Sequence, residues 1–208
     1  MNSSKGTRGA AGTVRVIGGK YRSRLLRVPA RPGLRPTPDR VRETLFNWLG
    51  QDLSGLACLD LYAGSGALGF EAASRGASRV VLVDKDRAAV AELERSRAAL
   101  GAIQVEIVSG DAVAYLAHGH ERPGARPHER LGARPAARFD VVFLDPPFRQ
   151  NAVPAILGIL PSRLEPGARV YIESEAPIAA AAPWTELKRA RAGQVNYQLL
   201  RWDGADAR

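Results

Sequence analysis

The sequence lacks most of what membrane and secreted proteins depend on. It holds one cysteine, Cys58, so no framework of disulfide bonds can form within the chain, and a reducing compartment is expected. No apolar run approaches the ~20 residues that span a bilayer. The early cations Lys5 and Arg8 are followed by no hydrophobic stretch, unlike those of a secretory signal. We therefore expect a soluble cytoplasmic protein with no membrane partner.

What the sequence does have is basic charge gathered at one end. Residues 1–50 carry eleven Lys and Arg against two acids, so the whole net charge of +9 lies there. Clustered cations attract phosphate and release counterions, which favours a nucleic-acid partner. The alternative is an arginine-rich composition that reflects coding bias, but such a bias would enrich arginine evenly along the chain.

The sequence predicts one catalytic domain preceded by two smaller N-terminal segments. Its 208 residues, 45% of them hydrophobic, can bury one full core. Residues 1–13 are rich in Gly, Ser and Ala and predict a disordered tail. Residues 14–50 predict a basic ribbon and helix that bind RNA rather than complete the fold, and residues 51–208 the catalytic domain.

The N-terminal segment 14–50 contains strand, turn and helix signals. Residues 14–28 predict strand–turn–strand, with Gly18-Gly19 as the turn. Lys20, Arg22 and Arg24 follow at alternate positions, which would place them on one ribbon face. Thr37-Pro38-Asp39 predicts a helix start with Thr37 as cap, and Gly50 ends this helix.

From residue 51 onward, apolar runs alternate with helical patterns. Strands are expected at 56–62, 79–84, 104–108, 139–144 and 169–173, and helices at 67–75, 86–100 and 153–160. Three of these strands are continuous apolar runs, as in parallel sheets covered on both faces. Strands at 184–190 and 194–202 are expected as an antiparallel edge pair. The pattern predicts a doubly wound, Rossmann-like α/β sheet of seven strands, mostly parallel and antiparallel at one edge.

Residues 118–137 interrupt this alternation of strands and helices. Arginines recur there at every fourth position, but prolines oppose a helix. All three histidines, His118, His120 and His128, also lie there without cysteines or carboxylates at ligand spacing, so we expect no metal site. The segment predicts a flexible basic insertion.

A glycine-rich loop follows the first strand of the catalytic domain. Gly64-x-Gly66-x-x-Gly69 opens a helix after Asp60, and Asp84 comes twenty residues after Gly64. The glycines allow a tight turn and a close backbone approach to a ligand, and the later acid can accept from ribose hydroxyls. The same pattern serves nicotinamide and adenosylmethionine enzymes, and a loop needed only for strand–helix packing would also match.

Two later motifs separate these possibilities. Asp111 follows the third strand, where it can accept from an adenine amino group or simply cap the next helix. Asp145-Pro146-Pro147-Phe148 follows the fourth strand, where the Asp145 carboxylate and the Pro146 carbonyl can converge on the two hydrogens of an –NH2 group. Phe148 offers a face for an extruded base. An ordinary buried turn is the alternative interpretation.

With these motifs the sequence resembles the class I methyltransferases. More narrowly, it resembles the bacterial 16S rRNA guanine-N2 methyltransferase family, from about residue 14 to 202. The matching stretches are 15–24, 35–49, 60–71, 145–149, 171–175 and 193–195. Two departures are a longer, more basic segment at 118–137 and Asp84 where Glu is common.

The resemblance implies S-adenosyl-L-methionine as cofactor and 16S rRNA as substrate, the latter within a small-subunit assembly intermediate, and a monomeric enzyme. The target base is expected at the catalytic residues Asp145, Pro146, Pro147 and Phe148. The cofactor-binding residues expected are Asp60, Tyr62, Gly64, Gly66, Asp84 and Asp111. The RNA-binding residues expected are Arg15, Lys20, Arg22, Arg24, Arg35, Arg40 and Arg42.

Other functions stay open at this point. An adenine-N6 methyltransferase of DNA or RNA uses the same Asp-Pro-Pro-aromatic motif. A glutamine-N5 methyltransferase of proteins uses a related motif with Asn first, against which Asp145 and the basic N-terminus argue. A non-catalytic RNA-binding assembly factor would not need the complete set of motifs. A nicotinamide oxidoreductase finds no support after Asp84.

Overall fold

The computed structural model describes residues 12–28, 37–118, 138–147 and 152–204. The elements run, in chain order, β1 (Gly12–Arg15), β2 (Leu25–Val28), α1 (Asp39–Leu49), β3 (Ala57–Asp60), α2 (Ala67–Ser74), β4 (Arg79–Asp84), α3 (Arg87–Leu100), β5 (Val105–Ser109), α4 (Ala112–His118), β6 (Phe139–Leu144), α5 (Ala152–Ile159), the 3-10 helix η2 (Leu160–Arg163), β7 (Leu164–Ser174), β8 (Trp184–Ala192) and β9 (Val195–Trp202).

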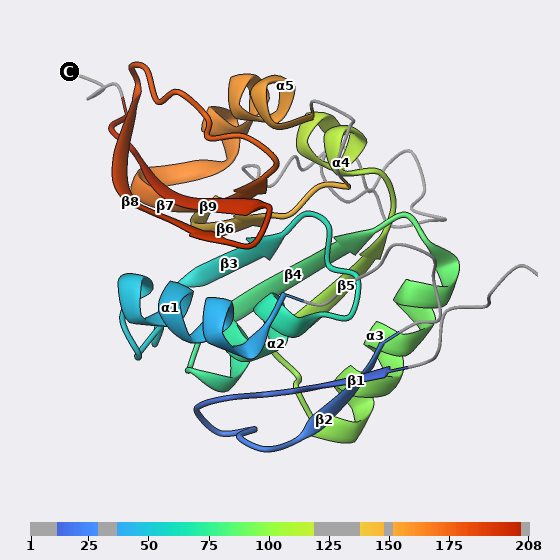
Figure 1. The fold of residues 1–208 in the computed structure, drawn as a ribbon. Helices are drawn as coiled ribbons and strands as arrows, with labels where there is room; N and C mark the ends of the chain where they lie inside the picture. Colours follow the sequence, from blue (N-terminus) through green and yellow to red (C-terminus); the bar gives the residue numbers. More distant parts are fainter. Residues whose placement is uncertain (1–11, 29–36, 119–137, 148–151, 205–208) are drawn as a thin grey trace, which may run out of the picture.

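Seven strands form the central sheet, in the order β5-β4-β3-β6-β7-β9-β8 (Figure 1). The first five pair in parallel, whereas β9 runs antiparallel to both β7 and β8. The strand order reverses between β3 and β6, which is the topological switch point of a doubly wound sheet. The predicted fold class is therefore confirmed.

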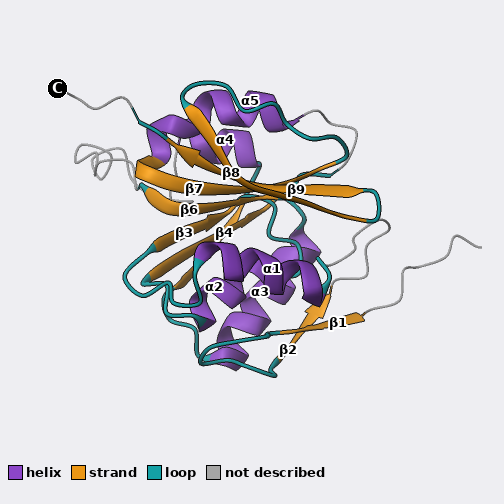
Figure 2. Cartoon of the chain, turned by 60° about the vertical axis from the view of Figure 1, so that its left-hand side comes forward, coloured by secondary structure: helices purple, strands orange, loops and turns teal. Residues whose placement is uncertain are grey.

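Helices cover both faces of this sheet, as Figure 2 shows, with α1, α2 and α3 on one side and α4 and α5 on the other. Two buried apolar clusters correspond to these two sides. Phe143 and Tyr171 belong to the first cluster, and their neighbours Leu144 and Ile172 to the second. The alternation follows from the period of two along a strand, and it decides on which side the residues at the strand ends lie.

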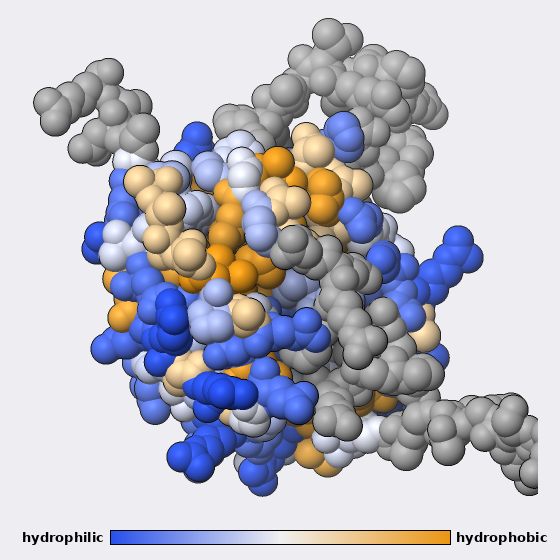
Figure 3. All heavy atoms as spheres, turned by 45° about the horizontal axis from the view of Figure 1, so that its top comes forward, coloured by the Kyte–Doolittle hydropathy of each residue, from blue (hydrophilic) through white to orange (hydrophobic). Residues whose placement is uncertain are grey.

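Hydrophobic residues are also exposed on the surface of the α4–α5 side. Figure 3 turns this side forward and shows hydrophobic residues gathered over its upper half, with hydrophilic residues below them. The sequence of α5 is almost wholly apolar, although only Val153 and Ile156 of this helix are buried. Among the described residues, no helix is both long and apolar enough to cross a membrane.

The expected elements agree with the structure in kind, and β4 and β6 agree in their bounds. Two short helices, α4 and η2, were not expected, and β7 is six residues longer than the expected 169–173. The side chain of Asp86 accepts from the backbone N–H groups of Ala88 and Ala89 and so caps α3.

The N-terminal segment is part of the same folded unit. β1 and β2 pair antiparallel, as expected for a ribbon. Buried side chains of the ribbon and of α1 belong to the same apolar cluster as α2 and the central strands: Val14, Val16, Leu26, Val28, Leu45 and Phe46. The N-terminal segment therefore helps to complete the fold, and the expectation that it does not is wrong. Its binding of RNA stays a prediction.

Three local expectations for the N-terminal residues are corrected. Gly12 and Thr13 belong to β1, so the expected tail 1–13 is too long; its other residues lie outside the described ones. The Thr37 side chain does not cap α1, because its hydroxyl donates to Glu173. Lys20 and Arg22 lie in the turn between the strands, and Arg24 just before β2, so alternation along a strand does not place them on one face.

Candidate active site

Acidic side chains end four neighbouring strands of the sheet. Asp60 ends β3, Asp84 ends β4, Asp145 directly follows β6, and Glu173 is the penultimate residue of β7. These carboxyl ends meet on both sides of the switch point between β3 and β6, where open α/β sheets bind their ligands. The topology thus brings together three acids that the sequence identified and one, Glu173, that it did not.

The glycine loop between β3 and α2 takes a conformation that needs glycine. Gly64 and Gly66 have φ of 53° and 76°, and Gly66 is the N-cap of α2. A Cβ at Gly66 would lie 2.6 Å from Leu93 Cδ2, and one at Gly69 would lie 2.0 Å from Leu82 Cδ2. The third glycine therefore serves helix–strand packing, and the first two shape the turn that faces the strand ends.

The Asp84 carboxylate is fixed beside this loop. Its Oδ2 accepts from the Gly64 N–H at 2.8 Å, and its Oδ1 accepts from the Asp86 N–H at 2.8 Å. The residue is 7% exposed, yet each carboxylate oxygen has a second lone pair. The side chain is thus pre-oriented and can still accept from two hydroxyl groups of a ligand.

Asp60 lies deeper, behind the loop. It is 2% exposed and accepts from the Gly69 N–H at 3.2 Å. Burial raises the pKa of Asp60 to about 7, with smaller contributions from the charges of Asp84 and Glu173. Its position supports the glycine loop, and a direct contact of Asp60 with a cofactor stays a prediction.

Tyr62 lies in the glycine loop itself, and Asp111 lies between β5 and α4. Tyr62 is half-buried, and its pKa is raised by burial and by the charge of Asp111. The exposed Asp111 accepts through Oδ1 from Val113 N at 2.9 Å and from Ala114 N at 3.2 Å, so it caps α4. The cap interpretation is confirmed, and an adenine contact through its other oxygen stays a prediction.

Asp145 combines partial exposure with a strongly perturbed environment. It is half-buried between the buried Leu144 and Pro146. Burial first, then the charges of Glu173 and Asp60, raise the pKa of Asp145 well above its ordinary value. Pro147 is exposed, and Phe148 lies outside the described residues.

Glu173 was missed by the sequence analysis. It is 5% exposed, and its Oε1 accepts from the hydroxyls of Thr37 and Tyr171, each at 2.9 Å. Burial raises the pKa of Glu173, whereas these two hydrogen bonds lower it. The signal that could have found it is an acid directly after the buried run Val170-Tyr171-Ile172, at the carboxyl end of a strand that pairs in parallel with β6.

The residues expected to bind RNA fall into three groups. Lys20, Arg22, Arg24 and Arg40 are exposed, although Arg24 donates to the Ala99 carbonyl at 2.9 Å. Arg15 is exposed and pairs with Asp39 at 3.3 Å. Arg35 lies outside the described residues.

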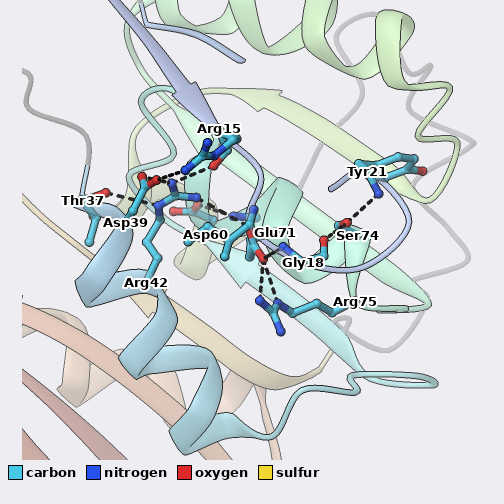
Figure 4. Close-up of polar contacts among 12 residues, drawn as sticks. Arg15, Gly18, Tyr21, Thr37, Asp39, Arg42, Asp60, Glu71, Ser74 and Arg75 are labelled. Carbon is cyan, nitrogen blue, oxygen red and sulfur yellow. Dashed lines mark hydrogen bonds and ion pairs between the residues drawn. The ribbon is translucent and has the colours of Figure 1, made fainter. Parts of the chain in front are cut away.

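Arg42 is the exception, and its expected RNA contact is wrong. Its side chain is fully buried in the network shown in Figure 4. The guanidinium donates to the carbonyls of Thr37 and Arg15 and to Asp39, and it lies 3.5 Å from Glu71. A cation enclosed by these partners has no surface to offer a phosphate.

No group of three or more His, Cys, Asp or Glu suited to hold a metal ion occurs in the described part of the chain. His118 ends α4, and His120 and His128 lie outside that part.

Comparisons with known proteins agree with this architecture. The family model described as "Conserved hypothetical protein 95" matches residues 14–201. The chain is 40% identical to "Ribosomal RNA small subunit methyltransferase D" of Escherichia coli (strain K12), over 91% of this chain and 90% of the relative. It is 39% identical to the protein of the same name from Haemophilus influenzae, over 93% and 96%. The solved structure of the Escherichia coli protein yhhF superposes with a TM-score of 0.77 at 38% identity, covering 93% of this chain and 100% of that chain.

Proposed function

This chain belongs to the conserved hypothetical protein 95 family, and on that premise we propose that it methylates small-subunit ribosomal RNA with S-adenosylmethionine. The observation that carries the proposal is the near full-length similarity to a relative named for this activity, at 40% identity. The acids at the strand ends give the activity a site with suitable chemistry.

The strand ends beside the glycine loop fit the cofactor. S-adenosylmethionine supplies an electrophilic methyl group when bound. Asp84, held by two backbone N–H groups, is oriented to accept from the ribose hydroxyls, and Gly64 and Gly66 leave the loop without side chains where the ligand approaches. Asp111 and Tyr62 are assigned to the adenine end, and Asp60 to support of the loop.

The acceptor is an exocyclic amino group, and we assign it to N2 of a guanine. Asp145 and the Pro146 carbonyl orient the two hydrogens of the amine and stabilise the positive charge that develops on its nitrogen. Adenine N6 presents the same –NH2 group, so the motif alone does not separate the two bases. The names of the relatives support rRNA as the substrate, and the resemblance of the N-terminal motifs supports guanine.

The RNA is assigned to the exposed cations of the N-terminal segment. Lys20, Arg22 and Arg24 lie in and beside a turn that is fixed to α2. The backbone N–H of Lys20 donates to the Ser74 carbonyl at 2.7 Å, and that of Tyr21 donates to the Ser74 hydroxyl at 2.8 Å. Anchored cations can contact phosphates in a defined register. We take the substrate to be 16S rRNA in a small-subunit assembly intermediate, and the enzyme to act as a monomer.

The test is methyl transfer from labelled S-adenosylmethionine to naked 16S rRNA, small subunits, large-subunit RNA and duplex DNA, side by side. The proposal expects label in 16S rRNA or small subunits alone. Label in DNA, or in every RNA equally, would contradict it. Calorimetry with S-adenosylmethionine and with NADH on the same protein separates the cofactor assignment from the substrate assignment.

A further inference from the structure

The proposed chemistry leaves one buried carboxylate at the site without a role. Glu173 is 5% exposed, and no Lys or Arg in the described ranges forms an ion pair with it. The hydrogen bonds that hold it come from two neutral hydroxyls, those of Thr37 and Tyr171. Burying a carboxylate without a cation is expensive, so an acid held in this way calls for an explanation in function.

Glu173 stands next to Asp145. β6 and β7 pair in parallel with Leu144 opposite Ile172, and both of these side chains point to the α4–α5 side. The following residues, Asp145 and Glu173, therefore both turn to the α1 side, on adjacent strands and at the same level. Asp60 of β3 points to that side too, one strand further along and two residues deeper, because it is paired with Phe143.

The surroundings of this pair are acidic or neutral. The charge of Glu173 acts on Asp145, and that of Asp145 acts on Tyr171. The helix α1 contributes the buried guanidinium of Arg42, which is engaged by two carbonyls, Asp39 and Glu71. Among the described residues, the titratable groups beside the pair are Asp60 from β3, Tyr171 within β7, and Tyr197 from β9, which is paired with Glu173 in the sheet.

We propose that Glu173 is a positioning residue whose charge beside Asp145 makes that carboxylate the acceptor of the proton released by the methylated amine. The inference rests on the proposed function. In the proton step, one N–H bond of the positively charged methylated nitrogen breaks, and its electron pair stays on nitrogen. The proton bonds to an Asp145 carboxylate oxygen. The amine and the carboxyl group both end neutral.

The physical reason is the basicity of the Asp145 carboxylate. An aspartate with an ordinary pKa of ~4 is a weak proton acceptor at neutral pH. Desolvation and the neighbouring charge of Glu173 both raise the pKa of Asp145, which brings it toward the pH at which the enzyme works. The Thr37 and Tyr171 hydroxyls donate to Glu173 and favour its ionised form, so within the pair the proton is directed to Asp145.

The test compares Glu173→Gln with the wild type, in two measurements. Carboxyl ¹³C NMR of the cofactor-free protein follows the titration of Asp145, and single-turnover methylation at saturating RNA gives the pH–rate profile. The variant should lower the pKa of Asp145 by about one unit or more, since a like charge is removed. The acidic limb of the rate should move down with it, while S-adenosylmethionine affinity and the KM for RNA stay within about twofold of the wild type. Glu175→Gln, which neutralises an exposed acid two residues on, is the matched control and should leave both measurements unchanged.

Thr37→Val provides a second route if Glu173→Gln fails to fold. It removes one hydroxyl that favours ionised Glu173, so Glu173 should take the proton of the pair more readily and Asp145 should again titrate at lower pH. If Asp145 has the same pKa in the wild type, Glu173→Gln and Thr37→Val, and the enzyme methylates rRNA, then this inference is wrong and the proposed function stands. If the pKa of Asp145 changes as expected but the protein methylates no RNA, then the proposed function is wrong and the proton-transfer role falls with it.

Discussion

Replacing Glu71 should be among the most destabilising conservative changes in this protein. Glu71 lies in α2 with a fully buried side chain. It accepts from Ile17 N at 2.7 Å, from Gly18 N at 2.8 Å and from Arg75 Nε at 2.9 Å. The Nη2 of Arg75 lies 2.7 Å away, and Arg42 Nη1 at 3.5 Å makes no hydrogen bond within the described residues (Figure 4). One carboxylate thus compensates two buried cations and ties the N-terminal segment to the sheet domain.

The size of the effect follows from this enclosure. Glu71→Gln keeps the volume but removes the charge and turns one acceptor into a donor that faces donors. Breaking one partner of a buried charge network costs about 3–5 kcal/mol, against a total stability of about 5–15 kcal/mol. For a chain of this size the melting temperature should fall by roughly 6–20 °C.

The matched control is Glu106→Gln. Glu106 pairs with Arg79 at 2.9 Å, but the two side chains are 39% and 40% exposed. An exposed pair contributes about 0.2–1 kcal/mol. Urea unfolding of both variants, followed by linear extrapolation, measures the difference. If the two free energies of unfolding agree within about 1 kcal/mol, the Glu71 network does not stabilise the fold as argued.

Two further predictions concern ligand binding. Asp84→Ala should weaken S-adenosylmethionine binding by about 1.5–3 kcal/mol, because the ribose hydroxyls then have no charged acceptor; calorimetry that finds unchanged affinity would remove Asp84 from the cofactor site. Neutralising Lys20, Arg22 and Arg24 together should weaken rRNA binding and flatten its dependence on log salt by about 0.9 for each phosphate that the variant no longer neutralises, with cofactor affinity unchanged. An unaltered salt slope would place the RNA surface elsewhere, with residues 118–137 the next candidate.

The sheet could be predicted from sequence because its signals are local. β4 and β6 are covered on both faces, so their central residues are apolar, and the apolar run gives the bounds directly. The helix α4 has seven residues, too few to show a period, and its cap Asp111 was equally consistent with a ligand contact. Long sequence patterns thus predicted the type of each long element, whereas the short helices could not be predicted in this way.

The sites depend on partners that are distant in sequence. Arg42 was grouped with the surface cations because nothing near it signals burial, whereas its partner Glu71 lies 29 residues on. The turn at Lys20 is shaped by Ser74, more than fifty residues away. Glu173 lies beside Asp145 only because β6 and β7 are neighbours in the sheet. Motifs predicted the acids of the glycine loop and of Asp145, but only tertiary pairing shows which charges are enclosed and which are free.

The most direct test of the central claim identifies the methylated nucleoside in 16S rRNA after single turnover with the wild type, Asp145→Ala and Asp145→Asn. Asp145 is half-buried, directly follows β6, and lies beside the buried Glu173 of the neighbouring strand β7. We predict that the wild type produces N2-methylguanosine. Asp145→Ala should lower the rate by about 10²–10³ or more because an orienting acceptor is removed, and its S-adenosylmethionine affinity should stay within a few fold. Asp145→Asn keeps a carbonyl acceptor and should retain measurable, lower activity. Formation of N6-methyladenosine, or a wild-type rate in Asp145→Ala, would contradict the account.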